Sequence, residues 1–325
     1  MASERTLAAR GPFSLAEASR FLCGFTPASG ACNVDGERVR IAFRLDGSFA
    51  PVGAALTQTR ETEGVQARLF GDGDADAIAR QAARILSLDH DARGYAAVGA
   101  RDAVVARAQA ALPGLRPVVF ASPYEAGAWG ILAQRTPMSR AAALKRALAE
   151  AHGDTLTVDG ARLAIFPSPA QLLAVAKFSG VADEKLARLH ALADAARAGV
   201  LDADRLRALP RDAAIAELSS LRGVGPWTAE HILVRGCGTA DVLPVAEPRV
   251  DAAVQLAYDL AAAPSPSEIA LIAEAWRPFR TWVTVALVVQ LARAGRFNGA
   301  ARTRSRTSSS APRRRAPRTG RPPAR

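Results

Sequence analysis

The chain has 325 residues, 49% of them hydrophobic, which is enough for two domains with buried cores. The net charge is +11, but nine arginines among the last 24 residues leave only +2 for residues 1–301. Charge therefore indicates an anionic partner for the C-terminal tail more than for the rest of the chain. Three cysteines are too few for a disulfide framework or for an iron–sulfur cluster with four thiolate ligands.

The chain also lacks the usual signals for a membrane. Its N-terminal stretch contains Glu4 and Glu17 and has no apolar signal core, and the longest apolar run, 283–291, is too short to span a bilayer. We therefore expect a soluble protein of a reducing compartment, the cytoplasm, without a membrane partner.

Residues 1–112 are predicted to form a small α+β domain that ends in a connecting helix. Val39, Ile41, Phe43 and Leu45 alternate with polar or small residues, which is typical of a half-buried strand. The predicted elements are a helix over 12–21, strands over 38–45, 51–59 and 65–70, and helices over 76–88 and 102–112.

Residues 113–297 are predicted to form an all-α domain, because no strand signal is seen from Asp102 onward. Residues 298–325 are rich in Arg, Ser and Pro and are predicted to be a disordered basic tail. The predicted helices cover 123–132, 138–151, 170–177, 183–198, 212–221, 226–235, 248–260 and 281–294. A capping pattern at Ser122 begins the first of them, and a second one at Ser265–Glu268 begins a further helix toward Trp276.

The stretch 221–230, Leu-Arg-Gly-Val-Gly-Pro-Trp-Thr-Ala-Glu, joins two of these helices. Gly223 and Gly225 predict a tight hairpin that bulky residues could not follow, and Pro226 suits the first turn of the next helix. Backbone N–H groups that converge at such a helix start can bind phosphate. The alternative is a plain helical hairpin with a glycine turn.

Four blocks of the sequence together resemble the helix-hairpin-helix DNA glycosylase superfamily, in particular the bacterial 3-methyladenine DNA glycosylase II group. In the order and spacing of that family, they are Phe120-Ala-Ser-Pro-Tyr-Glu-Ala-Gly-Ala-Trp-Gly-Ile-Leu-Ala-Gln134, the hairpin 221–236, Asp241-Val-Leu-Pro-Val-Ala-Glu247 and Trp276-Arg-Pro-Phe-Arg-Thr-Trp282.

The resemblance implies an α+β domain followed by a two-lobed helical domain with a cleft. It implies that an alkylated purine such as 3-methyladenine is flipped out of double-stranded DNA and excised in base excision repair. It further implies a monomer in the bacterial nucleoid that requires no cofactor. The alternative is a DNA-binding protein that retains the fold without catalysis.

Glu247 aligns with the catalytic aspartate of the family, so a glutamate stands where the pattern expects Asp. A carboxylate there would stabilise an oxocarbenium-like sugar and help to activate water. Pro248 is predicted to begin a helix, which places Glu247 at the positive end of a helix dipole. Asp251, four residues on, is the fallback acid. The alternative is that Glu247 only carries a helix-start charge.

Trp227 stands where family members with lyase activity carry a Schiff-base lysine, and tryptophan cannot form an imine. The resemblance therefore implies a monofunctional enzyme in which Trp227 stacks on the damaged base. His231 matches a pocket aromatic of the family, and Val288 falls where the C-terminal helix of relatives supplies another. The alternative for Trp227 and His231 is ordinary core or surface packing.

The resemblance also implies the DNA contacts. Gly223, Gly225 and Thr228 would hold a phosphate through backbone amides, and Gln134 with Arg135 match the site of the side chain that fills the gap left by the flipped base. A monovalent cation would be bound by hairpin carbonyls, which by analogy are those of Ser219, Leu221 and Val224. The charge of the tail, apart from the resemblance, favours contacts between its arginines and DNA that do not read the sequence; the alternative is a tail without a role.

Overall fold

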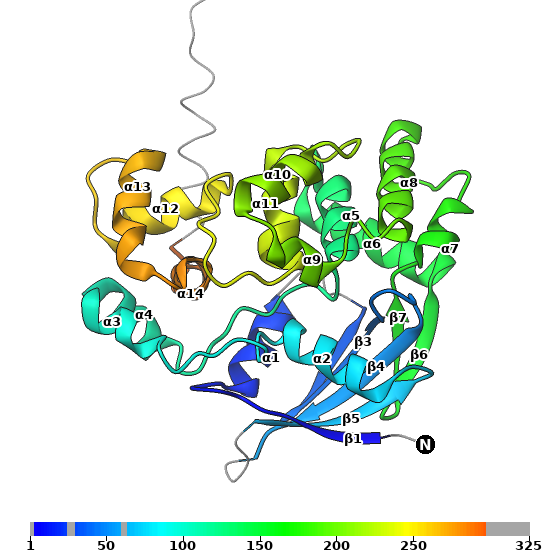
Figure 1. Cartoon of the computed structure of the whole chain (residues 1–325), viewed down its shortest axis with the longest axis horizontal. Helices are drawn as coiled ribbons and strands as arrows, with labels where there is room; N and C mark the ends of the chain where they lie inside the picture. The colour runs from blue at the N-terminus through cyan, green and yellow to red at the C-terminus, as the bar shows by residue number, and fades with distance from the viewer. Residues whose placement is uncertain (1–2, 25–29, 60–63, 297–325) are drawn as a thin grey trace, which may run out of the picture.

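The computed structural model describes residues 3–24, 30–59 and 64–296. Its N-terminal part is an antiparallel sheet in the order β1-β5-β4-β3-β2 (Figure 1). The strands are β1 (Ser3–Leu7), β2 (Cys32–Asp35), β3 (Arg38–Arg44), β4 (Pro51–Thr57) and β5 (Val65–Gly71). The three predicted strands are therefore present, whereas β1 and β2 gave no signal that we recognised.

One face of the sheet is covered by α1 (Leu15–Gly24) and α2 (Ala75–Ile85). Asp74 starts α2 by accepting hydrogen bonds from the amides of Asp76 and Ala77, and the apolar side of α2 is buried. The prediction that β3 is half-buried is wrong, because every residue of β3 after Arg38 is buried. A second layer on the opposite face explains the difference.

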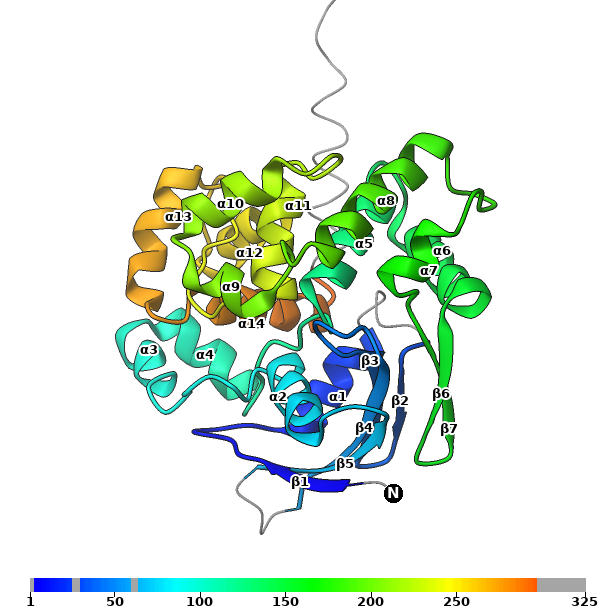
Figure 2. The ribbon, with the colours of Figure 1, turned by 45° about the vertical axis from the view of Figure 1, so that its right-hand side comes forward.

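That layer is a β-hairpin within the region predicted to be all-α, so the all-α prediction is wrong for 154–165. The strands β6 (Asp154–Val158) and β7 (Ala161–Ile165) pair in antiparallel register and pack on β3 and β4 (Figure 2). The packing is close: a Cβ at Gly53 would lie 2.5 Å from Val158 Cγ2. Asp159 and Gly160 form the turn with positive φ values of 46° and 83°, the favoured chemistry for a two-residue hairpin.

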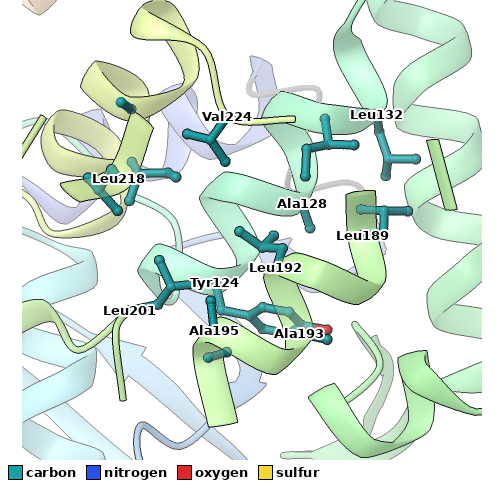
Figure 3. Packing of buried hydrophobic residues seen from close by; sticks show 14 of the residues in the cluster. Tyr124, Ala128, Leu132, Leu189, Leu192, Ala193, Ala195, Leu201, Leu218 and Val224 are labelled. Atoms are coloured by element: carbon teal, nitrogen blue, oxygen red, sulfur yellow. The ribbon is translucent and has the colours of Figure 1, made fainter. Parts of the chain in front are cut away.

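The remaining helices form two lobes. The first has a continuous apolar core between α5 and α8 that extends to the hairpin through Leu218 and Val224 (Figure 3). Its elements are α5 (Pro123–Ala133), α6 (Met138–His152), α7 (Pro169–Leu173), α8 (Asp183–Arg197), α9 (Ala203–Ala208), α10 (Arg211–Ser219), α11 (Pro226–His231) and a π-helical turn, η2 (Ile232–Gly236).

The second lobe combines helices from two separate stretches of the chain. In it, α4 (Ala103–Ala111) packs against α14 (Arg280–Arg293) across a shared core that contains Trp276 and Trp282. This core includes the connecting helix that the sequence predicts up to residue 112. Its elements are α3 (Ala96–Arg101), α4 (Ala103–Ala111), α12 (Pro248–Ala257), α13 (Pro266–Ala273), the 3₁₀ turn η3 (Glu274–Trp276) and α14 (Arg280–Arg293). The boundaries at 112 and 297 stay predictions, and the predicted tail 298–325 lies outside the described residues.

Arg116 attaches the segment between the second and first lobes to the N-terminal part of the chain. Its side chain is buried, and its guanidinium donates hydrogen bonds to the carbonyls of five residues. These are Arg10, Gly11, Pro12, Ser87 and His90. Because all five lie in the N-terminal part, this side chain bonds the connecting segment to the sheet domain.

Candidate active site

A cavity of about 430 Å³ opens where the two lobes and α1 meet. The first lobe contributes α11 and η2, the second contributes α12 and α14, and α1 contributes Arg20 and Phe21. This is within the size range of pockets that bind small organic ligands. Glu247, Trp227 and His231, which the sequence predicts as site residues, all line it, whereas Asp251 does not.

Glu247 is held at the start of α12 by four hydrogen bonds. As the N-cap residue it accepts one from the backbone N–H of Arg249 at 3.2 Å. The Arg249 guanidinium donates from Nε to Oε1 at 2.7 Å and from Nη2 to Oε2 at 3.2 Å. Trp227 Nε1 donates to Oε2 at 3.2 Å. The predicted position of Glu247 at a helix N-terminus is confirmed.

These contacts decide the charge of Glu247. Burial alone would raise the pKa of the carboxyl, since its side chain is only 19% exposed. The hydrogen bonds and positive charge of Arg249, with the Trp227 N–H, outweigh burial and hold the pKa below its ordinary value. The site therefore presents a carboxylate at neutral pH.

Trp227 and His231 form a stacked pair, with ring centroids 4.8 Å apart and planes inclined by 15°. Burial, followed by the charge of Arg235, lowers the pKa of His231 to about 3, so the imidazole is neutral. Its buried Nε2 has no hydrogen-bond partner in the described part of the chain. The pair thus gives the cavity one flat, uncharged aromatic wall.

Sequence reasoning missed one part of the wall and anticipated another. Phe21 of α1 lies below the Arg235 guanidinium, 5.2 Å from ring centroid to Cζ, and nothing in the chain pattern links residue 21 to this site. On α14, the wall is aliphatic and includes Val285, Val288 and Val289. Val288 therefore lines the cavity as its alignment suggests, without supplying an aromatic ring.

Glu230 is a second carboxylate of the cavity wall, and it is 4% exposed. Its Oε1 accepts a hydrogen bond from Arg211 Nη2 at 2.7 Å, and its Oε2 accepts one from the backbone N–H of Ala246 at 2.8 Å. Glu230 thereby connects the first residue of α10 to the loop that precedes Glu247. Both oxygens of Glu230 accept these hydrogen bonds, so its side chain positions the loop that precedes Glu247.

The two glycines of the hairpin differ in their backbone requirement. Gly223 has a φ of +84°, which favours glycine, whereas Gly225 is extended with a φ of −86°. A Cβ at Gly225 would meet nothing within 4 Å. The prediction that both positions need glycine for the turn is therefore wrong for Gly225. Thr228 is buried with its methyl group against Gly130, so only its backbone could face DNA.

The loop after α5 is anchored to the hairpin. Gln134 Nε2 donates to the Gly223 carbonyl at 2.7 Å, and Arg188 donates to Gln134 Oε1 at 2.9 Å. Lys185 Nζ donates to the carbonyls of Leu132 and Gln134 and to Thr136 Oγ1, at 2.9–3.0 Å. Arg135 stands exposed at the tip with a φ of +50°. Gln134 thus holds the loop in place, and Arg135 is the side chain presented outward.

Ser219, Leu221 and Val224 lie where α10 ends and the hairpin turns. The turn is closed by a hydrogen bond from the Val224 N–H to the Leu221 carbonyl at 3.0 Å. Neutral carbonyl oxygens within one turn are suitable ligands for a monovalent cation. The described residues contain no group of three or more His, Cys, Asp or Glu side chains that could hold a metal ion.

No protein-family model matches the chain. A DNA-3-methyladenine glycosylase of Bacillus subtilis is 25% identical over 202 residues, 61% of this chain and 66% of the relative. DNA-3-methyladenine glycosylase 2 of Escherichia coli is 31% identical over 183 residues, 54% of this chain and 60% of the relative. The matches thus span slightly less than two thirds of these relatives. None of the described helices is long and apolar enough to cross a membrane.

Among solved structures, a 3-methyladenine DNA-glycosylase from Archaeoglobus fulgidus has a TM-score of 0.72 at 21% identity, covering 88% of this chain and 97% of the other. A Clostridium acetobutylicum 8-oxoguanine glycosylase/lyase in complex with DNA has a TM-score of 0.58 at 15% identity, covering 81% and 98%. In sequence the chain is therefore similar to DNA-3-methyladenine glycosylases, and its fold is similar to that of solved DNA glycosylases.

Proposed function

We propose that this protein is a monofunctional DNA glycosylase that flips alkylated purines such as 3-methyladenine out of double-stranded DNA and hydrolyses their N-glycosidic bond. The observation that carries the proposal is the ionised Glu247 at the edge of a base-sized aromatic cavity. A base in such a cavity must leave the duplex stack, because its sugar bond is otherwise out of reach of the acid.

The main requirement of this reaction is a negative charge close to the sugar. As the glycosidic bond breaks, its electron pair leaves with the base, and an alkylated cationic purine departs as a neutral molecule. Positive charge develops on the sugar, where the Glu247 carboxylate stabilises it. Water then adds its hydroxyl to C1′, and the Glu247 side chain helps to orient it and to accept its proton on the way to solvent.

The monofunctional character rests on Trp227. A lyase needs an amine that attacks C1′, and the described residues that line the cavity include no lysine. Trp227 instead donates its N–H to Glu247 and presents its ring beside His231. The expected product is an intact strand with an abasic site.

DNA would be held without reading its sequence. The amides at Gly223, Gly225 and the first turn of α11 would bind a phosphate, Arg135 would fill the gap left by the base, and the arginine tail would add contacts to the duplex. A monovalent cation at the carbonyls of Ser219, Leu221 and Val224 would stiffen the hairpin. We propose a monomer that acts at the nucleoid and needs no other cofactor.

The test is incubation of the wild type with a methylated duplex, followed by chromatography of released bases and alkali cleavage at abasic sites. Release of 3-methyladenine without strand nicking is expected. Tight DNA binding without release would instead support a non-catalytic DNA-binding protein. Nicking together with a borohydride-trapped covalent adduct would contradict the monofunctional mechanism.

Two carboxylate variants identify the acid. Glu247→Gln should lower the single-turnover rate by orders of magnitude while DNA binding remains. Asp251→Asn, the matched control on the same helix, should keep the wild-type rate because Asp251 does not line the cavity. The reverse result would move the catalytic role to Asp251.

A further inference from the structure

We propose that Arg249 is a positioning residue that fixes the Glu247 side chain in one orientation for catalysis. This inference rests on the proposed function. It starts from the geometry, in which the guanidinium of one arginine, two residues further along, donates to both oxygens of the carboxylate, and its backbone N–H donates to Oε1 as well. No other side chain contributes more than one hydrogen bond to Glu247 among the described contacts.

The length of the glutamate makes such a contact necessary. A glutamate stem has several rotatable bonds and loses rotamer entropy when it is ordered, so a glutamate without contacts would sample several positions at the cavity edge. The guanidinium is a planar fork that matches a carboxylate with two parallel hydrogen bonds. Arg249 therefore selects one orientation of Glu247, and Trp227 approaches Oε2 from the opposite helix.

The other charged groups around the cavity cannot replace it. His231 is neutral, and the charge of Glu230 is paired with Arg211. Arg293 and Arg20 of the cavity wall both pair with Glu17 of α1. Arg235 donates to the carbonyl of Val118 and lies over Phe21. Arg249 is the cation whose hydrogen bonds to Glu247 are found in the described structure.

The contact has a cost as well as a benefit for catalysis. A guanidinium beside the carboxylate weakens the field that Glu247 exerts on the developing sugar cation. In return, the carboxylate stays ionised and aimed although it is mostly buried. If positioning dominates, removal of Arg249 slows the reaction, and if the weakened field dominates, removal accelerates it.

The chain offers a matched control. Arg93 contacts Asp91 with the same spacing of two residues, donating from its backbone N–H and from Nε at 3.0 Å. Both arginines are exposed, with side-chain exposures of 74% for Arg93 and 55% for Arg249. Arg93 does not line the cavity. Arg93→Ala thus removes an ion pair of the same spacing that does not line the cavity.

The first readout is independent of activity. Glutamate labelled with ¹³C at the side-chain carboxyl is titrated by NMR, and Glu247 is assigned by its loss in Glu247→Gln. Its midpoint should lie below that of an ordinary glutamate in the wild type and rise by about 1–3 pH units in Arg249→Ala. Arg249→Lys should fall between them, because lysine keeps the charge but not the fork, and Arg93→Ala should match the wild type.

The second readout is the pH profile of single-turnover base release. A lowered pKa keeps Glu247 ionised as pH falls, so the activity of the wild type should persist to lower pH. In Arg249→Ala, the pH below which activity is lost should rise by the same amount as the Glu247 midpoint measured by NMR. At pH values well above the Glu247 midpoints of both proteins, base release by Arg249→Ala should still be slower than by the wild type, and Arg249→Lys should restore part of the rate.

The outcomes separate the two proposals. An unmoved NMR midpoint in an active enzyme would refute the role of Arg249 alone, as would a faster rate in Arg249→Ala at high pH. Absence of base release by the wild type, with the NMR difference intact, would refute the glycosylase and with it the catalytic purpose of the contact.

Discussion

The two hairpin glycines are expected to separate stability from DNA binding. Gly223 adopts a left-handed backbone, whereas Gly225 is extended and a side chain there would point into open space. Alanine at position 223 should therefore disturb folding. Alanine at position 225 should leave folding unchanged and obstruct whatever approaches the hairpin from outside, which we propose is a DNA phosphate.

The magnitudes follow from the backbone and the neighbours. An alanine in the left-handed region costs about 1–2 kcal/mol. Its Cβ at position 223 would lie 2.5–2.8 Å from carbons of the Arg188 side chain, which would have to move away from Gln134. For a domain of this size, that corresponds to a melting temperature lower by about 2–8 °C. Gly225→Ala should change the free energy of unfolding by no more than about 0.5 kcal/mol.

The assay pairs thermal unfolding with fluorescence anisotropy on a duplex that contains an abasic-site analogue, at one fixed salt concentration. Gly225→Ala should bind more weakly with an unchanged melting temperature. Equal losses of melting temperature in the two variants would refute the backbone argument. Wild-type affinity in Gly225→Ala would refute the placement of a phosphate at this hairpin.

Three further outcomes are expected. Glu230→Ala should slow base release more than it weakens DNA binding, because the Arg211 guanidinium and the Ala246 amide each lose a buried acceptor, worth about 1–3 kcal/mol; equal effects on rate and affinity would contradict a positioning role. Lys185→Met should reduce base flipping, followed with 2-aminopurine fluorescence beside the lesion, because the Arg135 loop loses three hydrogen bonds; unchanged flipping would show that the loop needs no anchor. Deletion of residues 302–325 should flatten the dependence of log affinity on log salt, since each arginine that contacts a phosphate contributes about −0.9 to the slope; an unchanged slope would leave the tail without a role in binding.

The sequence predicts well those features that local chemistry determines. Ser122 and the Ser265–Glu268 pair cap α5 and α13, and Glu247 followed by Pro248 marks the start of α12. Each signal lies within four residues and depends on backbone groups that any helix start leaves without partners. The cap at Glu247 therefore also places the proposed catalytic acid.

Features that depend on distant segments were missed, and for different reasons. Phe21 reaches the cavity only because α1 packs beside α14, with Glu17 bonded to Arg293, and no spacing along the chain encodes that contact. The β6–β7 hairpin had a local signal, Asp159-Gly160 between alternating apolar residues, which helical neighbours led us to overlook. Arg249 is only two residues from Glu247 in the sequence, but its orientation toward the carboxylate depends on side-chain rotamers that the sequence does not specify.

The fold alone does not decide the reaction. A glycosylase/lyase that acts on 8-oxoguanine superposes with a TM-score of 0.58, so a two-lobed helical domain with a hairpin is compatible with strand-nicking chemistry as well. What separates the mechanisms is the group that faces C1′: an amine would attack it, whereas a carboxylate can only stabilise its charge and assist water. By the resemblance, the amine would stand at position 227, where this cavity instead has Trp227, which donates a hydrogen bond to the carboxylate of Glu247. The proposed hydrolysis therefore depends on these two side chains, and a Trp227→Lys variant that gained a borohydride-trapped adduct with DNA would show that residue 227 alone controls the choice.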